Sequence, residues 1–213
     1  MISVKAFTFN PVQENTYLLY NDRNQCCIID PGCYFEEERN ELTQFIQLQE
    51  LQPISLLNTH CHLDHIFGNK YVHDKWGLEL HIHEKEKQVL EFGPSSGQMY
   101  NLPFENYNGP LHFIIPGETI KIGDDELQIL FTPGHSPGSL SFYAKKEKFV
   151  ISGDALFNGS IGRTDLPGGD FDTLANSIRE QLYTLPDEVK VYSGHGPLTR
   201  VGDEKKNNPF VKA

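Results

Sequence analysis

The sequence has no long hydrophobic run. Its most apolar stretches, such as Ile54–Leu57, Leu127–Phe131 and Phe149–Ile151, contain five residues or fewer. A helix that crosses a bilayer needs about 20 consecutive apolar residues, so we expect no membrane-spanning segment and no membrane partner. The start, MISVKAFTF, also lacks the basic and then apolar pattern of a signal peptide. We therefore expect a cytoplasmic protein.

Basic residues and paired cysteines are both scarce. The chain has 18 lysines and arginines against 29 aspartates and glutamates, which gives a formal net charge of −11. An acidic surface repels phosphate backbones, so we expect no nucleic-acid partner. The four cysteines do not form two separated CxxC pairs, so neither a disulfide framework nor a four-cysteine zinc site is indicated. These cysteines are Cys26, Cys27, Cys33 and Cys61.

The chain has 213 residues, which is enough for one well-packed domain and short for two, so we expect residues 1–213 to form a single domain. Apolar patterning and turn residues predict nine strands and three helices. The strands are Val4–Phe9, Thr16–Tyr20, Cys26–Asp30, Ile54–Thr59, Leu78–His83, Leu127–Thr132, Ser139–Tyr143, Phe149–Ser152 and Val189–Tyr192. The helices are Phe35–Leu51, His65–Trp76 and Phe171–Leu185.

Many strands with a few interspersed helices favour an α/β layered architecture, and hairpin-like early strands favour mixed sheets over purely parallel ones. One stretch, Phe92–Ile115, carries few regular signals because glycines and prolines alternate with aromatic residues along it. Long segments of this kind are either binding loops or lids, or surface loops with packed aromatic side chains.

The densest group of metal-ligand residue types follows a buried strand. Residues 59–65 read Thr-His-Cys-His-Leu-Asp-His, directly after the apolar run Ile54–Leu57. In an extended chain, side chains two apart point the same way, so His60 and His62 can face one ion together. Asp64 and His65 are adjacent and cannot both continue that alignment. The chain must turn there, and the turn can bring both side chains to a second ion.

Three more residues of these types follow other predicted strands. His135 follows LQILFTPG, Asp154 follows FVISG, and His195 follows VKVYSG. Each is preceded by glycine, which lets the backbone approach a crowded site. If the ends of these strands share one edge, all the side chains converge there.

Imidazole and carboxylate are ligands for zinc, iron or manganese. We expect two divalent ions, with zinc as the expected metal and iron or manganese as alternatives. One ion would take His60, His62 and His135, and the second would take Asp64, His65 and His195. Two cations side by side repel each other, which predicts a bridging carboxylate, and Asp154 is assigned that role. Asp30, in CCIIDPG, either hydrogen-bonds a ligand histidine or forms a turn.

Four segments in this order resemble the metallo-β-lactamase superfamily: THCHLDH (59–65), TPGHSPGS (132–139), SGDALF (152–157) and SGHGP (193–197). The resemblance implies an αββα sandwich of two mixed β-sheets flanked by helices, with a dinuclear site at one edge. It also implies the same seven ligands as the spacing argument.

Within that superfamily the chain looks like a glyoxalase II-type hydrolase, on the segment GSIGRTDLPGGD (159–170) and the ending GPLTRVGDEKKNNPF (196–210). This likeness implies that Arg163 binds substrate. Only 18 residues follow His195, so we expect no C-terminal glutathione-binding helical domain, and the chain resembles the short glyoxalase II-like proteins.

The resemblance implies a metal-dependent hydrolase that cleaves a small-molecule thioester of the hydroxyacylglutathione type by metal-bound hydroxide. Asp64 would be both a ligand and a catalytic residue that orients the hydroxide. A persulfide dioxygenase with one iron on His60, His135 and Asp154 is the main alternative. β-Lactam hydrolysis and a purely structural metal are weaker alternatives, because no cysteine ligand follows the GD segment and because seven ligands exceed a closed four-coordinate site. The sequence does not predict an oligomeric state.

Overall fold

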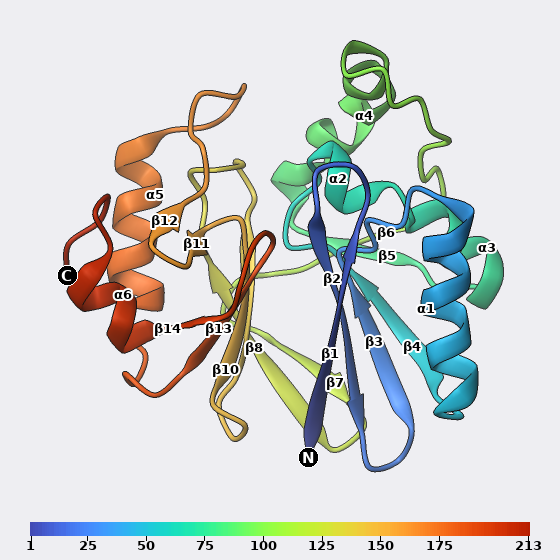
Figure 1. Cartoon of the computed structure of the whole chain (residues 1–213), viewed down its shortest axis with the longest axis horizontal. Helices are drawn as coiled ribbons and strands as arrows, with labels where there is room; N and C mark the ends of the chain where they lie inside the picture. Colours follow the sequence, from blue (N-terminus) through green and yellow to red (C-terminus); the bar gives the residue numbers. More distant parts are fainter.

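Two six-stranded β-sheets face each other in the computed structural model, which describes residues 1–213 (Figure 1). The first sheet has the order β1-β2-β3-β4-β5-β6, with strands Ile2–Phe9, Glu14–Asn21, Gln25–Ile29, Gln52–Leu57, Leu80–Ile82 and Leu111–Phe113. The second has the order β14-β13-β10-β9-β8-β7, with strands Thr199–Arg200, Lys190–Ser193, Phe149–Gly153, Leu140–Ala144, Asp125–Phe131 and Thr119–Ile122. A small hairpin joins β11 (Leu156–Phe157) to β12 (Ser160–Ile161).

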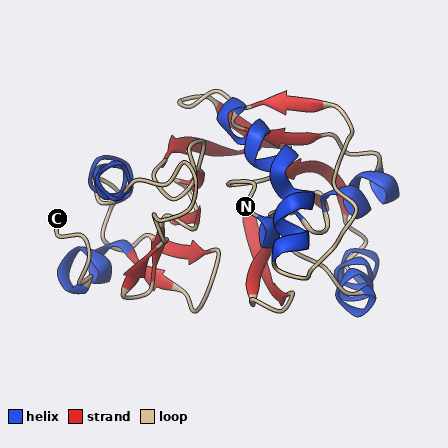
Figure 2. Ribbon diagram, turned by 90° about the horizontal axis from the view of Figure 1, so that it is seen from above, coloured by secondary structure: helices blue, strands red, loops and turns tan.

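Helices cover the outer face of each sheet (Figure 2). The α-helices are α1 (Glu36–Leu48), α2 (Leu63–Ile66), α3 (Asn69–Trp76), α4 (Lys87–Met99), α5 (Phe171–Ser177) and α6 (Val201–Asn207). A 3₁₀ turn, Glu84–Glu86, precedes α4, and a π-helical turn, Ile178–Leu182, continues α5. None of the helices combines the length and apolarity that a bilayer crossing requires.

The central strands of both sheets are buried on both faces, and β3 shows how the sequence achieves this. Cys26 and Ile28 point into the apolar layer beneath α1 and α3, whereas Cys27 and Ile29 point into the layer between the sheets. Such a strand reads as a continuous apolar run because each alternate residue meets a different core. The αββα sandwich with mixed sheets that we expected is confirmed, since β1, β2 and β3 pair antiparallel while β3, β4, β5 and β6 pair parallel.

Each of the nine predicted strands is present, with ends shifted by up to two residues. Five short strands escaped prediction because they have two to four residues each: β6, β7, β11, β12 and β14. Helix α6 was also not predicted, and α1 is shorter at both ends than the expected Phe35–Leu51.

The predicted helix His65–Trp76 is in fact two helices, α2 and α3, which meet at Gly68. The Gly68 N–H donates to the carbonyl oxygen of Pro31 (2.7 Å) instead of continuing the α2 ladder. A Cβ at this position would lie 2.4 Å from the Cys33 sulfur, so the break depends on glycine. Helix α3 ends at Gly77 in the left-handed conformation, as a glycine after the last helical residue indicates.

The prediction that Phe92–Ile115 lacks regular structure was wrong at both ends, because α4 runs on to Met99 and β6 occupies Leu111–Phe113. Pro94 lies inside α4 and cannot donate a hydrogen bond to the Leu90 carbonyl. The Asn106 side-chain amide donates to that carbonyl instead, at 2.7 Å. A side chain from outside the helix therefore replaces the backbone donor that proline removes.

Candidate metal centre

The structure brings all seven predicted ligand residues together where the two sheets meet. They follow the carboxyl ends of four strands, β4, β8, β10 and β13, which belong to both sheets. Gly194 permits this convergence, because a Cβ there would lie 2.0 Å from the Asp154 Oδ1 atom.

Three histidines form the first trio. The His62 Nδ1 and His135 Nε2 atoms are 2.8 Å apart, and the His135 Nε2 and His60 Nε2 atoms are 3.2 Å apart. All three ligand atoms lie within 4.8 Å of one another. Nitrogen atoms at such spacing surround a volume that suits one ion.

Asp64, His65 and His195 form the second trio, and their ligand atoms also lie within 4.8 Å of one another. The Asp64 Oδ2 atom is 3.0 Å from the His195 Nε2 and 3.6 Å from the His65 Nε2. The division into a three-histidine set and an aspartate-histidine-histidine set is the one that the sequence spacing predicts.

Asp154 lies between the trios. Its Oδ1 atom is 3.4 Å from the His65 Nε2, while its Oδ2 atom is 3.4 Å from the His135 Nε2 and 3.6 Å from the His195 Nε2. One carboxylate therefore faces ligand atoms of both trios, which is the geometry that a bridging ligand requires.

Two orphaned atoms test whether these residues fit metal ions. The His65 Nε2 and the Asp154 Oδ1 are buried and have no hydrogen-bond partner within the protein. Buried polar atoms are normally paired. An unpaired imidazole nitrogen and an unpaired carboxylate oxygen that face each other are suited to bind one cation between them. The donor set and these orphaned atoms fit divalent cations.

The two trios differ in electrostatic character. Burial, together with the neighbouring imidazoles, lowers the pKa of His62 to about 3 and that of His60 well below its usual value. Burial also opposes protonation of His65 and His195. The carboxylates of Asp154 and Asp64 together outweigh burial around His65, and the Asp64 hydrogen bond together with the charges of Asp154 and Asp64 outweighs it for His195, so the pKa of each rises. His60 and His62 are therefore neutral imidazoles, whereas His65 and His195 hold protons that a metal would replace.

The two aspartates of the site stay ionised. Burial alone would raise the pKa of both Asp64 and Asp154, but His65 together with the other nearby histidines reverses that effect and holds both pKa values below the usual range. Ionised carboxylates are the form that binds a cation.

Asp30 lies behind the site. The sequence left open whether it hydrogen-bonds a ligand histidine or forms a turn, and the structure places it beside His65. Its carboxylate accepts hydrogen bonds from the Thr59 N–H (2.7 Å), the Thr59 hydroxyl (2.6 Å) and Asn58 (3.1 Å), and it lies 3.1 Å from the His65 Nδ1. Because the Thr59 hydroxyl donates to Asp30, its oxygen is left to accept from the His60 Nδ1 at 3.1 Å. These contacts direct the Nε2 atoms of His60 and His65 toward the centre.

The segment around Arg163 contacts the first trio through its backbone. The Arg163 carbonyl oxygen lies 2.7 Å from the His135 Nδ1, which therefore donates to it. The guanidinium group is exposed and forms a two-pronged ion pair with Asp165, with both N···O distances 2.7 Å. The structure thus places Arg163 beside the centre.

Sequence reasoning missed two fully buried glutamates. Glu14 accepts a hydrogen bond from the Thr16 hydroxyl (2.9 Å), and its other oxygen lies 3.8 Å from the His65 Nδ1 without a hydrogen bond. Burial raises its pKa well above the usual value. The only signal in the sequence is a charged residue at the start of an otherwise buried strand. The second glutamate, Glu86, is described below.

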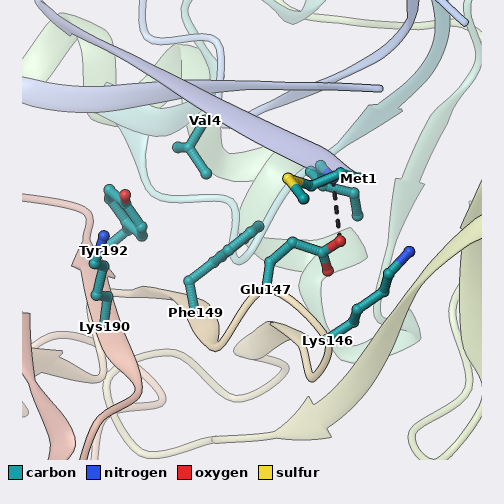
Figure 3. A pocket seen from close by; sticks show the side chains of 8 residues that line it. Met1, Val4, Lys146, Glu147, Phe149, Lys190 and Tyr192 are labelled. Atoms are coloured by element: carbon teal, nitrogen blue, oxygen red, sulfur yellow. Dashed lines mark hydrogen bonds between the residues drawn. The ribbon is translucent and has the colours of Figure 1, made fainter. Parts of the chain in front are cut away.

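A surface cavity of about 380 Å³ lies away from this centre (Figure 3). It opens at the amino ends of β10 and β13, whereas the histidines follow the carboxyl ends of these strands. Within it, the Ile2 N–H donates to Glu147 at 3.2 Å. None of the seven candidate ligands lines this cavity, so its position says nothing about the metal centre.

Paired clusters of histidine and aspartate at the junction of an αββα sandwich define a protein of the metallo-hydrolase type. A family model described as the metallo-beta-lactamase superfamily matches residues 9–195. The chain therefore belongs to the metallo-beta-lactamase superfamily.

Two relatives match almost the whole chain. It is 44% identical over 202 residues to the probable metallo-hydrolase YqgX of Bacillus subtilis, and this alignment covers 94% of this chain and 93% of that protein. It is 37% identical over 215 residues to the hydroxyacylglutathione hydrolase GloC of Haemophilus influenzae, and this alignment covers 100% of this chain and 97% of that protein.

Three solved structures illustrate the shared fold, each with more than 25% sequence identity to this chain. The BLEG-1 B3 metallo-beta-lactamase has a TM-score of 0.91 at 38% identity, covering 99% of this chain and 100% of that one. TTHA1623 in a di-iron-bound form has a TM-score of 0.88 at 35% identity, covering 97% and 100%. ETHE1 from Myxococcus xanthus has a TM-score of 0.78 at 26% identity, covering 97% and 83%.

Proposed function

We propose that the chain is a metal-dependent hydrolase with two divalent ions that cleaves a small-molecule thioester of the hydroxyacylglutathione type. The first ion is held by His60, His62 and His135, and the second by Asp64, His65 and His195. Zinc is the proposed metal, with iron or manganese as alternatives. The observation that carries the proposal is the position of Asp154, whose two oxygens face both trios.

The substrate class is supported by the relative named hydroxyacylglutathione hydrolase, which covers the whole chain. A thioester also suits the site chemically. Its leaving group is a thiolate whose thiol has a pKa of about 8.5, so departure needs no strong protein acid. Divalent ions bound here would polarise the thioester carbonyl and lower the pKa of a water molecule toward neutrality.

The protein's own residues orient the reactants. Asp64 is the least buried carboxylate of the centre, and its Oδ2 atom would accept a hydrogen bond from the attacking water. Arg163, which stands at the edge of the centre, would pair with a substrate carboxylate. Its present partner, Asp165, would have to be displaced.

The test combines metal analysis with a thioester panel on one sample. We expect two metal ions per chain, loss of thioester hydrolysis on chelation, and recovery when zinc, iron or manganese is restored. Asp154→Ala should lower both metal content and rate, whereas Asp172→Ala, a change in an acidic residue on α5 outside the centre, should lower neither. Full metal occupancy without hydrolysis of any thioester would overturn the proposal.

A second candidate is a persulfide dioxygenase with a single iron. Here His60, His135 and Asp154 would form the iron site, with the His135 Nε2 lying 3.2 Å from the His60 Nε2 and 3.4 Å from the Asp154 Oδ2. Two histidines and one carboxylate are a common iron(II) ligand set. One iron per chain and oxygen uptake with glutathione persulfide would favour this function over hydrolysis.

A further inference from the structure

Glu86 is a fully buried carboxylate that belongs to neither trio. It is the last residue of the 3₁₀ turn Glu84–Glu86 and directly precedes α4. A carboxylate without solvent needs hydrogen-bond donors, and Glu86 has three. They are the Cys61 N–H at 2.8 Å, the Ser136 hydroxyl at 2.6 Å and the Gly138 N–H at 2.7 Å.

The two oxygens of Glu86 bind different loops. Its Oε2 accepts from Cys61, which stands between two histidines of the first trio, and its Oε1 accepts from Ser136 and Gly138, which follow the third. One side chain thus joins two segments that are about 75 residues apart in sequence. Gly138 permits the contact, because a Cβ there would lie 2.9 Å from the Glu86 Cγ.

The second trio is anchored by other residues. The Asn10 amide donates to the Asp64 carbonyl at 3.0 Å, and the Asn58 amide donates to the His65 carbonyl at 2.8 Å. The Asn15 amide holds the segment around His195 through the carbonyl oxygens of residues 193 and 196. No hydrogen bond links Glu86 to these segments, so its influence on the two trios is unequal.

We propose that Glu86 is a positioning residue that sets the spacing between the loop of His60 and His62 and the loop of His135, and thereby determines metal affinity at the first trio alone. The inference rests on the proposed metal-binding function. Glu86 is in neither trio, and both of its oxygens accept hydrogen bonds from the two loops. Its role is to hold three imidazoles at distances that one ion can span.

Glu86→Gln is the informative change because it keeps the shape and removes one acceptor. The amide oxygen can serve one loop, but the amide nitrogen would then face a donor of the other. We measure zinc affinity by competition with a chromogenic chelator in two backgrounds. In His195→Ala, which leaves the first trio, Glu86→Gln should weaken zinc binding about tenfold or more. In His62→Ala, which leaves the second trio, adding Glu86→Gln should not change zinc affinity.

Two further variants distinguish positioning from general loss of stability. Ser136→Ala removes one donor and should weaken the first trio in the same direction by a smaller factor. Glu204→Gln is the matched control, because Glu204 is also a buried carboxylate that accepts from Gly159, Thr199 and Asn208, and none of these is a candidate ligand. It should leave zinc affinity unchanged even where it lowers resistance to urea.

The inference is overturned if Glu86→Gln binds zinc at the first trio like its parent, or if Glu204→Gln weakens zinc binding as much. It is also overturned if Glu86→Gln weakens both trios equally. Failure of the proposed function gives a separate result, because it would show as full metal occupancy without hydrolysis of any thioester, whereas the Glu86 experiment measures zinc affinity alone.

Discussion

His135 and Arg163 are joined by a hydrogen bond in which the imidazole Nδ1 donates to the backbone carbonyl oxygen at 2.7 Å. A carbonyl oxygen only accepts, so this contact fixes the proton on Nδ1 and leaves the Nε2 lone pair facing the first trio and Asp154. The segment that carries the proposed substrate-binding side chain therefore also orients a proposed metal ligand. Two changes in this segment separate the two roles.

Gly162→Ala should damage metal binding. A Cβ at this position would lie 1.9 Å from the Asp154 carbonyl oxygen and 2.9 Å from the His135 Nδ1, so the backbone must move. We expect about tenfold weaker zinc binding at the first trio, measured by chelator competition. Arg163→Ala is the control, because it retains the carbonyl oxygen and should retain the metal. Equal zinc affinity in Gly162→Ala and the unmodified chain would contradict the prediction.

Asp165→Asn should improve the binding of anionic substrates. The ion pair with Asp165 occupies the Arg163 guanidinium, and a substrate carboxylate must compete with it. Exposed ion pairs contribute up to about 1 kcal/mol, so we expect KM for a carboxylate-bearing thioester to fall by up to about fivefold. Arg163→Ala should raise the same KM, and a neutral thioester should respond to neither change. A KM that rises in Asp165→Asn would argue against a substrate role for Arg163.

The metal-free protein should lose stability as the pH rises above neutral. Despite burial, the surrounding carboxylates raise the pKa values of His65 and His195 in the folded chain. The raised values lie above the value of about 6.5 that a histidine has in the unfolded chain. The folded chain therefore keeps protons that the unfolded chain releases, and the stabilisation present below pH 6.5 is lost as the pH rises through the folded pKa values. The lowered pKa values of His60 and His62 act below neutral pH and do not mask this loss.

Urea unfolding in excess chelator measures this effect. Between about pH 7 and about pH 9, the free energy of unfolding should fall by on the order of 1 kcal/mol per pH unit for each proton retained. His195→Gln should reduce the slope because it removes one of the titrating groups. A stability that is constant or rises over this interval would show that the two imidazoles are not protonated in the folded chain.

Asn106→Ala should destabilise α4. It removes the donor that serves the Leu90 carbonyl, which Pro94 leaves without a helical partner. We expect a loss of about 1 kcal/mol in the free energy of unfolding by urea. In a Pro94→Ala background the new backbone N–H can serve that carbonyl, so the same Asn106 change should then cost less. An identical loss in both backgrounds would assign the effect of Asn106 to another contact.

The candidate ligand residues could be located in the sequence because they follow the ends of buried strands, in three cases directly after a glycine. Local pattern carries that information, as His135, Asp154 and His195 illustrate. Glu14 and Glu86 carry no such pattern, because their burial depends on partners distant in the chain, as with the contact from Glu86 to Gly138.

The same reason explains the errors in secondary structure. Helix α4 contains Gly93, Pro94 and Gly97, which individually favour turns. A Cβ at Gly97 would lie 2.7 Å from the Leu102 carbonyl oxygen, so this glycine serves close packing inside a helix. Compensation from Asn106 is equally invisible in a local window. That the chain is a single domain, and that Arg163 binds substrate, stay predictions.

The division of the strands between the two sheets has a consequence for assembly. Residues 1–113 contain β1 to β6, residues 119–213 contain β7 to β14, and the chain passes between the sheets once, at residues 114–118. Each trio takes two side chains from the first part and one from the second. Bound ions would thus act as removable cross-links between halves that share one covalent connection. Two polypeptides divided at residues 114–118 would form a complete centre only in their complex, and bound metal would add to the association that the apolar layer between the sheets provides.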